Sequence, residues 1–286
     1  ARRLGSVPPQ PTSEPKPARP TSRPRQAWAI RLALTVIAAC IIGGLFAART
    51  KAPPADWQKI TFRRGSLSAA RFGPEREILF SAAWDGGPAA LFSANPGSPG
   101  ARALSVADAR LVGVSQRGEV AFIETHPGSP PVLSRSPLAG GPAKQVLERV
   151  VAADMTADGL AFAVAHLVPG RGTVIEFPIG REVAQSNLAS HLRISPDGER
   201  LAFVEHPVAG DDRGAVIVLA ADGRRLAVSA NFPSMEGLAW SARGDEVLFT
   251  ASRSGSSSGL FALDLRGRER TVLPGGGRLV IHDVAR

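Results

Sequence analysis

Three histidines recur at nearly the same place in successive segments of the sequence. His126, His166 and His206 each follow the end of an apolar run by a few residues. Three imidazole groups that converge can hold a metal ion. One of the three is out of step with the other two, however, and equivalent positions in a ring of repeats lie apart around its axis. We therefore expect loop histidines, and we assign no metal and no other cofactor to this chain.

A second group of polar residues has the spacing of a catalytic motif. Residues 255–259 read Gly-Ser-Ser-Ser-Gly and match the Gly-x-Ser-x-Gly pattern around a nucleophilic serine. That motif needs a sharp strand-to-helix turn together with His and Asp partners, and no helical pattern follows here. We expect a Ser/Gly loop. Asp85, Asp211 and Asp212 are likewise expected to be solvated loop carboxylates rather than cation ligands.

The motifs of phosphoryl transfer do not occur in this sequence. It has no His-Arg-Asp or Asp-Phe-Gly segment of a protein kinase, no phosphate-binding Gly-x-x-x-x-Gly-Lys-Ser/Thr loop and no His-Glu-x-x-His. We therefore assign no catalytic residue and expect that these 286 residues do not transfer phosphate.

The elements that must position these polar residues are hairpins that share one turn. Ser195, Pro196, Asp197 and Gly198 separate two apolar runs of strand length. Proline presets φ at the second turn position and glycine accepts the positive φ that lets the chain reverse, so the pattern predicts a β-hairpin with a repeat-turn signature. Related turns contain Gly118, Gly159 and Gly244, and a degraded copy occupies residues 72–80.

The spacing of these turns predicts the fold class. The turn glycines lie about 40 residues apart, the period of four-stranded propeller blades. We predict an all-β fold: a β-propeller of four-stranded blades that starts near residue 57. Five complete blades are expected at about 68–104, 108–147, 150–186, 189–229 and 235–273, with the start of a sixth at 277–286. Because a repeat array needs covered ends, we expect residues beyond 286 to close the ring.

Aromatic residues recur in the first two predicted strands of the blades. This placement favours packing between blades over a ligand cage. The residues concerned are Phe72, Phe80, Phe122, Phe162, Phe203, Trp240 and Phe249.

An uncharged apolar stretch precedes the repeats. With residues 27–30 added, residues 32–48 reach the ~20 residues that a helix needs to cross a bilayer. We predict a transmembrane helix over 27–48, anchored by Trp28, Arg31, Leu32, Ala48 and Arg49, in which Arg31 and Trp28 reach the membrane interface. Residues 1–26 are a Pro/Arg-rich linker expected to be disordered, and 49–56 form a short spacer.

Three other interpretations of the apolar stretch remain open. It could be a buried core helix, a cleaved signal peptide, or a lipoprotein leader in which Cys40 ends an Ile-Ala-Ala-Cys box. The flanking charges do not decide the orientation. The arginines upstream favour a cytoplasmic linker and an extracytoplasmic propeller at the inner (plasma) membrane.

The net charge of +9 is concentrated at the amino-terminal end of the chain. Residues 1–26 carry six basic residues and one acidic residue, and Arg31, Arg49 and Lys51 add three more charges, so residues 52–286 retain only +1. A basic protein often binds nucleic acid. Here the charge flanks the predicted membrane segment, so we expect the bilayer as a partner and no nucleic acid on the propeller.

The repeats resemble the TolB-type, WD-like propeller repeat, whose signature is an apolar strand, Ser-Pro-Asp-Gly and a second apolar strand. Residues 193–203 match it closely. The order of segments also resembles the C-terminal half of bacterial transmembrane serine/threonine protein kinases, where a Pro-rich linker, one membrane helix and an extracytoplasmic propeller follow the kinase domain. Residues 60–65, 68–72, 81–86 and 91–93 are similar to the first blade of that family.

These resemblances imply a non-catalytic sensor or interaction propeller of a receptor-type kinase, with a protein or cell-envelope ligand on one propeller face. Three alternatives share the same features. The chain could be a TolB-like cell-envelope scaffold or the outer half of a membrane-bound winged-helix transcription regulator. It could also precede an α/β-hydrolase, as in prolyl-oligopeptidase-like enzymes.

Overall fold

The computed structural model describes residues 57–98, 100–254 and 257–285. The predicted linker (1–26), membrane helix (27–48) and spacer (49–56) lie outside these residues, and so do the anchor residues named above. Within the described part of the chain, no helix is long and apolar enough to cross a membrane. All of the described strands belong to one compact unit, Lys59–Arg286.

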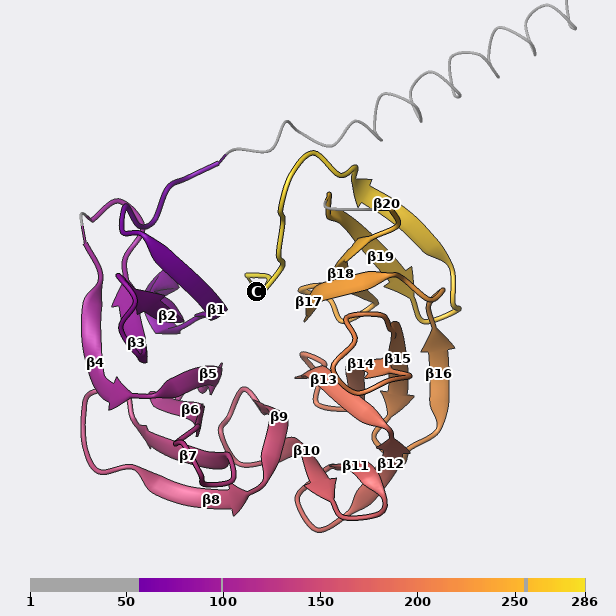
Figure 1. Cartoon of the computed structure of the whole chain (residues 1–286), viewed down its shortest axis with the longest axis horizontal. Helices are drawn as coiled ribbons and strands as arrows, with labels where there is room; N and C mark the ends of the chain where they lie inside the picture. The colour runs from indigo at the N-terminus through magenta and orange to yellow at the C-terminus, as the bar shows by residue number, and fades with distance from the viewer. Residues whose placement is uncertain (1–56, 99, 255–256, 286) are drawn as a thin grey trace, which may run out of the picture. The chain divides into compact units, whose positions relative to one another are not determined.

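This unit consists of five antiparallel sheets of four strands each, arranged around one axis in an open ring (Figure 1). The prediction of an all-β propeller with five four-stranded blades is therefore confirmed. The first blade comprises β1 (Gly65–Phe72), β2 (Ile78–Trp84), β3 (Ala89–Ala94) and β4 (Arg102–Ala107); the second comprises β5 (Ala109–Val114), β6 (Glu119–Glu124), β7 (Val132–Pro137) and β8 (Lys144–Glu148). The third comprises β9 (Val150–Met155), β10 (Phe162–Val168), β11 (Gly172–Glu176) and β12 (Glu182–Ser186). The fourth comprises β13 (Leu188–Ile194), β14 (Arg200–His206), β15 (Ala215–Ala220) and β16 (Arg225–Val228); the fifth comprises β17 (Ser234–Trp240), β18 (Glu246–Ser252), β19 (Gly259–Asp264) and β20 (Glu269–Leu273).

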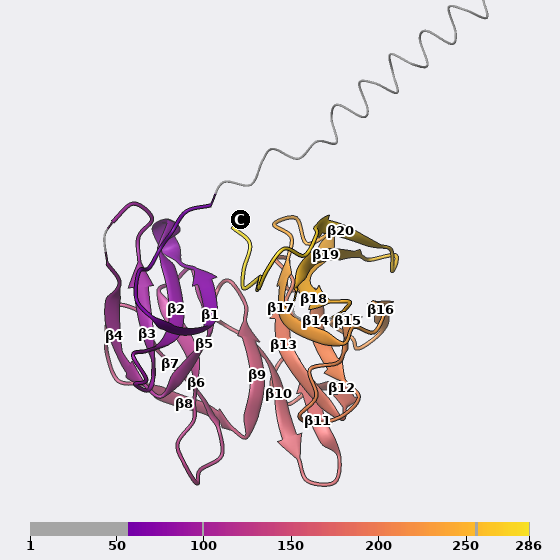
Figure 2. The ribbon, with the colours of Figure 1, turned by 45° about the horizontal axis from the view of Figure 1, so that its top comes forward.

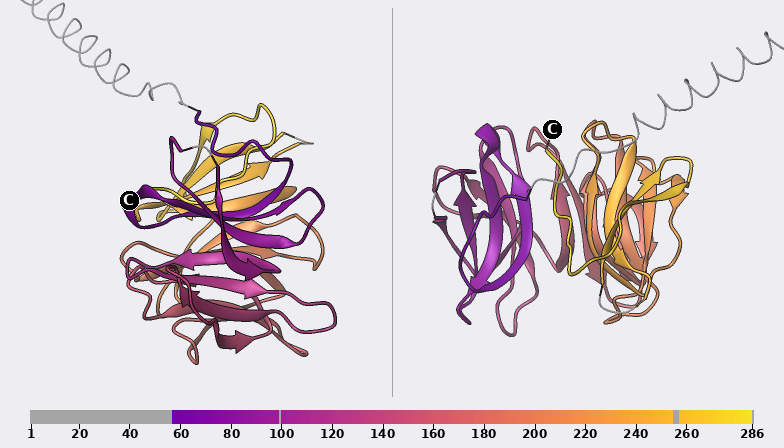
Figure 3. Two further views of the ribbon diagram at one scale, coloured as in Figure 1. Left: turned by 90° about the vertical axis from the view of Figure 1, so that its left-hand side faces the viewer. Right: turned by 90° about the horizontal axis from the view of Figure 1, so that it is seen from above.

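Each blade is a meander in which strands that follow one another in sequence are hydrogen-bonded neighbours. The first strand of each blade, β1, β5, β9, β13 or β17, lies nearest the ring axis (Figure 1). The strands run roughly along that axis (Figure 3). In every blade the pairing of the first two strands contains one register shift. Such bulges increase strand twist, and twisted sheets are what a propeller blade requires.

The blades are joined by very short connections. Asp108 alone links β4 to β5, and Arg149 alone links β8 to β9. Both residues have positive φ, at 52° and 61°, a conformation that is uncommon outside glycine. The chain therefore reverses within one residue and sets each blade directly against the previous one.

The hydrophobic core lies between the blades. Four clusters of buried residues each join two consecutive blades, and a fifth covers the free face of the first blade. The predicted packing between blades holds for the aromatic residues in the list that ends this paragraph. It was wrong for Phe72, which is 42% exposed, and for Phe80, which is buried within the first blade alone. Both belong to the first blade, which has no preceding blade to cover it. The residues buried between blades are Phe122, Phe162, Phe203, Trp240 and Phe249.

The expected start of a sixth blade is not a strand. Residues 274–285 belong to no strand, because no described strand pairs with them. The segment instead passes from the fifth blade toward β1 (Figure 2). Gly277 accepts a hydrogen bond from the Ser258 backbone N–H (3.0 Å), and the Asp283 carboxylate accepts one from the Phe72 N–H (2.9 Å). This C-terminal segment therefore connects the last blade to the first.

Candidate functional site

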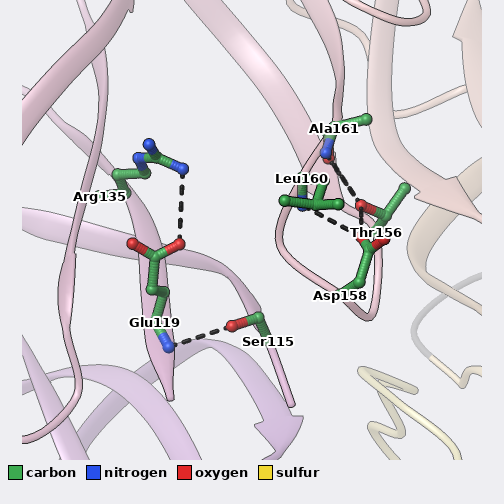
Figure 4. Close-up of polar contacts among 7 residues, drawn as sticks. All are labelled: Ser115, Glu119, Arg135, Thr156, Asp158, Leu160 and Ala161. Carbon is green, nitrogen blue, oxygen red and sulfur yellow. Dashed lines mark hydrogen bonds and ion pairs between the residues drawn. The ribbon is translucent and has the colours of Figure 1, made fainter. Parts of the chain in front are cut away.

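The signature turns lie at one end of the ring, which we call the turn face. It consists of the β1–β2, β5–β6, β9–β10, β13–β14 and β17–β18 connections. Figure 4 shows two of these turns. In the third blade the Thr156 hydroxyl donates to the Asp158 carboxylate (2.6 Å) and accepts from the Ala161 N–H (3.0 Å), while Asp158 also accepts from the Leu160 N–H (3.0 Å). The Thr156 and Leu160 hydrogen bonds hold the pKa of Asp158 below its ordinary value.

The second blade uses the same plan with fewer side-chain bonds. The Glu119 N–H donates to the Ser115 hydroxyl (3.1 Å), and Arg135 approaches the Glu119 carboxylate at 3.4 Å (Figure 4). The Ser115 N–H in turn donates to the Glu119 carbonyl at 2.9 Å, so the two residues are joined by one backbone and one side-chain hydrogen bond. Both turns of Figure 4 are thus closed by their own side chains.

The structure places the sequence signature of the fourth blade in the β13–β14 turn. The Ser195 hydroxyl is buried, accepts from the Arg200 N–H (2.9 Å) and donates to Asp197. Asp197 also accepts from the Glu199 N–H (3.1 Å) and pairs with Arg200. Gly198 has φ of 76°, the left-handed conformation that lets the chain reverse. Pro196 lies between these residues with a half-buried ring. The polar groups of this turn are satisfied locally, which is the arrangement of a structural motif.

The three histidines singled out by their spacing do not converge. His166 Nε2 lies 3.0 Å from Glu176, and His206 contacts the Ser190 hydroxyl at 2.7 Å. His126 lies in an exposed turn. Among the described residues, no group of three His, Cys, Asp or Glu side chains could hold a metal ion.

The singled-out loop residues have local partners as well. Asp85 pairs with Arg63 at 2.8 Å, and Asp211 pairs with Arg213. Of the Ser/Gly loop, residues 255 and 256 lie outside the described chain, and Ser258 contacts Glu236 at 3.4 Å. Asp212, the next residue after Asp211, is exposed.

A different set of charged residues converges at the ring axis. The next-to-last residue of the innermost strand occupies the same register position in all five blades. In chain order these residues are Arg71, Gly113, Asp154, Arg193 and Ala239. A Cβ at Gly113 would be in ordinary contact with the Asp154 carboxylate at 3.5 Å and slightly tight against Met155 Cβ at 3.3 Å, so the Gly113 backbone packs directly against the third blade. The position thus gathers two arginines and one aspartate around one axis.

The C-terminal segment supplies the centre of this arrangement. The His282 carbonyl accepts hydrogen bonds from Arg71 (3.0 Å) and from Arg193 (3.3 Å), although these arginines come from the first and fourth blades. The backbone of the segment approaches so closely that a Cβ at Gly237 would lie 2.2 Å from the Ile281 carbonyl oxygen. Gly237 therefore makes room for the segment in the fifth blade.

Arg110 of β5 completes what we call the axial arginine cluster, which consists of Arg71, Arg110 and Arg193. Arg110 donates to the Val151 carbonyl at 2.8 Å. Part of its side chain is exposed to water, yet the surrounding protein desolvates the guanidinium, and this burial, followed by the charge of Arg71, lowers the pKa of Arg110. Among the described residues, none of the three guanidinium groups has a carboxylate oxygen within 4.0 Å. The Nε of Arg193 is buried and has no hydrogen-bond partner in this described part of the chain.

The electrostatics of the cluster reflect this crowding of cations. Burial, and next to it the charge of Arg71, lowers the pKa of Arg193 to about 9. Burial and then the neighbouring arginines lower the pKa of His191 to about 3 and that of His282 to about 4. Both imidazoles are therefore neutral at pH 7 and add no charge to the cluster.

Asp154 is the buried acid of the layer. Burial raises its pKa, while Arg193 and Arg71 act in the opposite direction. Its carboxylate accepts a hydrogen bond from the Ile194 N–H at 2.8 Å and so links the third blade to the fourth. With Asp283 it provides the nearby negative charge, and three arginines face these two acids.

Two further features mark the turn face. Phe72 and Leu160 are apolar residues that remain 42% and 68% exposed there. A surface depression of about 590 Å³ lies beside the first and second blades and is lined by Glu75, Arg76 and Leu138 among others. Glu75 and Arg76 both have positive φ, at 57° and 65°, so the degraded turn of the first blade has a strained backbone.

No protein-family model and no curated protein sequence matches this chain. Solved structures do match it. The propeller is similar to TolB from Acinetobacter baumannii, with a TM-score of 0.63 and 16% identity over 77% of this chain and 58% of that one. A protein from Agrobacterium tumefaciens assigned as TolB gives a TM-score of 0.56 and 15% identity over 74% of this chain and 83% of that one. The chain thus has a TolB-like β-propeller fold.

The same fold likeness extends to an enzyme. An oligogalacturonate lyase in complex with manganese matches with a TM-score of 0.50 and 15% identity over 75% of this chain and 66% of the lyase. This chain spans 58% of the length of the Acinetobacter protein. At such identities the likeness defines the fold alone, and function must be argued from the residues of the site.

Proposed function

We propose that this chain is a membrane-anchored binding propeller that recognises a protein or other cell-envelope ligand through its turn face. The observation that carries the proposal is the axial arginine cluster. Arg71 and Arg193 are each the next-to-last residue of their strand, at the end next to the turn face. Arg71 is buried and Arg193 is half-buried. Neither has a carboxylate oxygen within 4.0 Å among the described residues. Charged groups held without partners cost stability, and ligand sites are where proteins keep such groups.

The exposed apolar residues also favour the turn face as the binding surface. Leu160 and Phe72 would contribute apolar contact area around a polar centre, which is the usual anatomy of a binding surface. The TolB-like fold is compatible with this function, because propellers present rigid faces that need no catalytic machinery.

The membrane part of the proposal rests on residues outside the described structure. The uncharged stretch 27–48, flanked by Arg31 and Arg49, is long enough for a single span. It would place the propeller outside the inner membrane and the Pro-rich linker in the cytoplasm.

A finer version of the proposal makes the chain the non-catalytic C-terminal part of a receptor-type serine/threonine kinase. It is supported by the order of linker, apolar stretch and propeller. The TolB-like scaffold is supported equally by the fold, and a winged-helix regulator has the same layout. The gene sequence upstream of Ala1 separates these versions. An open frame of about 300 codons with His-Arg-Asp and Asp-Phe-Gly motifs is expected for the kinase, and a winged-helix domain or an early start codon would contradict it.

The binding proposal itself can be tested by site-specific photocrosslinking of the full chain in its own membrane. A photoreactive amino acid replaces Leu160 on the turn face or Val208 in the β14–β15 connection at the opposite end. These two apolar residues are matched in exposure, at 68% and 54%. We expect one discrete crosslinked product from position 160 and none from position 208. Equal products from both positions, or none from position 160, would contradict the proposal.

A further inference from the structure

The axial arginine cluster has more hydrogen-bonding capacity than its surroundings use. A guanidinium group carries N–H donors on all three of its nitrogens. Arg110 uses one nitrogen, toward Val151, and the buried Nε of Arg193 uses none. The carbonyls that the cluster does meet are neutral acceptors and leave the positive charge unbalanced.

The C-terminal segment shows what kind of group fits at the axis. It is an extended polypeptide whose His282 carbonyl receives hydrogen bonds from Arg71 and Arg193. One residue further on, the Asp283 carboxylate receives the Phe72 N–H. The axis therefore accepts peptide backbone and an acidic side chain from the chain itself, while Arg110 and Arg193 Nε have no carboxylate of their own.

We propose that the axial arginine cluster binds a carboxylate group of an extended acidic peptide, held by Arg110 and Arg193 beside the C-terminal segment. The planar guanidinium fork matches the two oxygens of a carboxylate. Arg110 is the solvent-exposed member of the cluster, and it stands near the start of β5 and donates to Val151 near the start of β9. The site therefore extends along the axis from Arg193, near the turn face, toward the opposite strand ends. This inference rests on the proposed binding function and names the chemistry of the ligand.

The test is isothermal titration calorimetry on the full chain in detergent micelles at low salt, because screening weakens such contacts. The main probe is an N-acetylated, C-amidated hexaglutamate, and hexaglutamine of the same form is its neutral control. Pentaglycine with a free or an amidated C-terminus distinguishes a terminal carboxylate from a side-chain carboxylate as the source.

The variant Arg110→Gln removes the charge of the accessible arginine at nearly constant length. Its matched control is Arg225→Gln, an exposed arginine in β16, the outermost strand of the fourth blade. We expect hexaglutamate to bind and hexaglutamine not to bind. Arg110→Gln should weaken binding about tenfold, since a hydrogen bond to a charged group is lost, whereas Arg225→Gln changes it less than about twofold.

Other outcomes would overturn the inference. Equal losses in both variants would mean general surface attraction. Tight binding of inorganic phosphate without peptide binding would assign a different anion. Arg110→Lys keeps the charge and serves as a second variant if Arg110→Gln does not fold; it should show an intermediate loss, and wild-type affinity would contradict the proposal. If acidic peptides fail while position 160 still crosslinks a partner, only this inference falls and the binding function stands.

Discussion

The signature turn of the fourth blade and the axial arginine cluster are neighbours in the chain, since Arg193 lies two residues before Ser195. They differ in how their polar groups are satisfied. In the turn, Ser195 and Asp197 exchange hydrogen bonds with each other and with Arg200. In the cluster, Arg193 donates to two carbonyls, and its buried Nε has no partner. The hydrogen bonds of the turn stabilise the fold, whereas we expect the incompletely paired arginines of the cluster to lower its stability.

The largest effect should come from removing the buried acid of the cluster. Asp154→Ala leaves the Ile194 N–H without its acceptor and takes away the negative charge between Arg71 and Arg193. We expect the free energy of unfolding to fall by about 3 kcal/mol. Chemical unfolding of the full chain in micelles measures this. Asp158→Ala, in the turn of the same blade, is the control and should cost less. Equal losses of unfolding free energy in the two variants would show that the axial acid matters no more to stability than a turn residue.

The next effect concerns pH. The pKa of His191 is about 3 in the folded chain against about 6.5 when unfolded. Between these values the unfolded chain takes up a proton that the folded chain does not, so stability falls as the pH falls. From pH 7 to pH 5 the contribution is about 2 kcal/mol.

This pH effect can be isolated with His191→Asn, because asparagine tolerates the φ of 53° at this position. The variant should lose about 2 kcal/mol less than wild type between pH 7 and pH 5. His282 acts in the same direction and the raised pKa of Asp154 acts against it, but both are common to the two proteins. Identical pH profiles in unfolding experiments would show that His191 is not held neutral.

A smaller difference separates two copies of the turn. The Ser195 hydroxyl accepts from the Arg200 N–H at 2.9 Å, whereas the Ser241 hydroxyl lies 3.4 Å from the Glu246 N–H. We expect Ser195→Ala to destabilise by about 1.5 kcal/mol and Ser241→Ala by about half as much. Unfolding midpoints of the two variants provide the measurement. The reverse order would mean that hydrogen-bond geometry does not set the cost of these turns.

Much of the fold could be predicted because its determinants are local. The Ser-Pro-Asp-Gly turn and its weaker copies specify hairpins, and their spacing specifies blades. The exceptions have a common cause. Phe72 and residues 277–285 lie where the array has no neighbouring blade, and burial or strand pairing at such an edge depends on tertiary contacts that a repeat pattern does not contain.

The candidate site was harder to predict for the same reason. Arg71, Arg110 and Arg193 stand in three blades, and although Arg193 opens the 193–203 repeat segment, the repeat signature does not specify an arginine there. A signal was present, since Asp154 and Arg193 precede the turn glycines Gly159 and Gly198 by the same number of residues. Aligning the repeats on their turns would have placed these two charged residues at the same position of neighbouring innermost strands. The contribution of His282 could not be read in this way, because it comes from a segment that forms no strand.

The most direct test of the comparison between turn and cluster is the unfolding free energy of Arg110→Gln. If Arg110 is kept for a ligand, its removal relieves repulsion by Arg71, and stability should stay within about 0.5 kcal/mol of wild type or rise. A loss of about 2 kcal/mol or more, equal to that of a turn residue, would show that the arginine cluster holds the propeller together and would contradict the account.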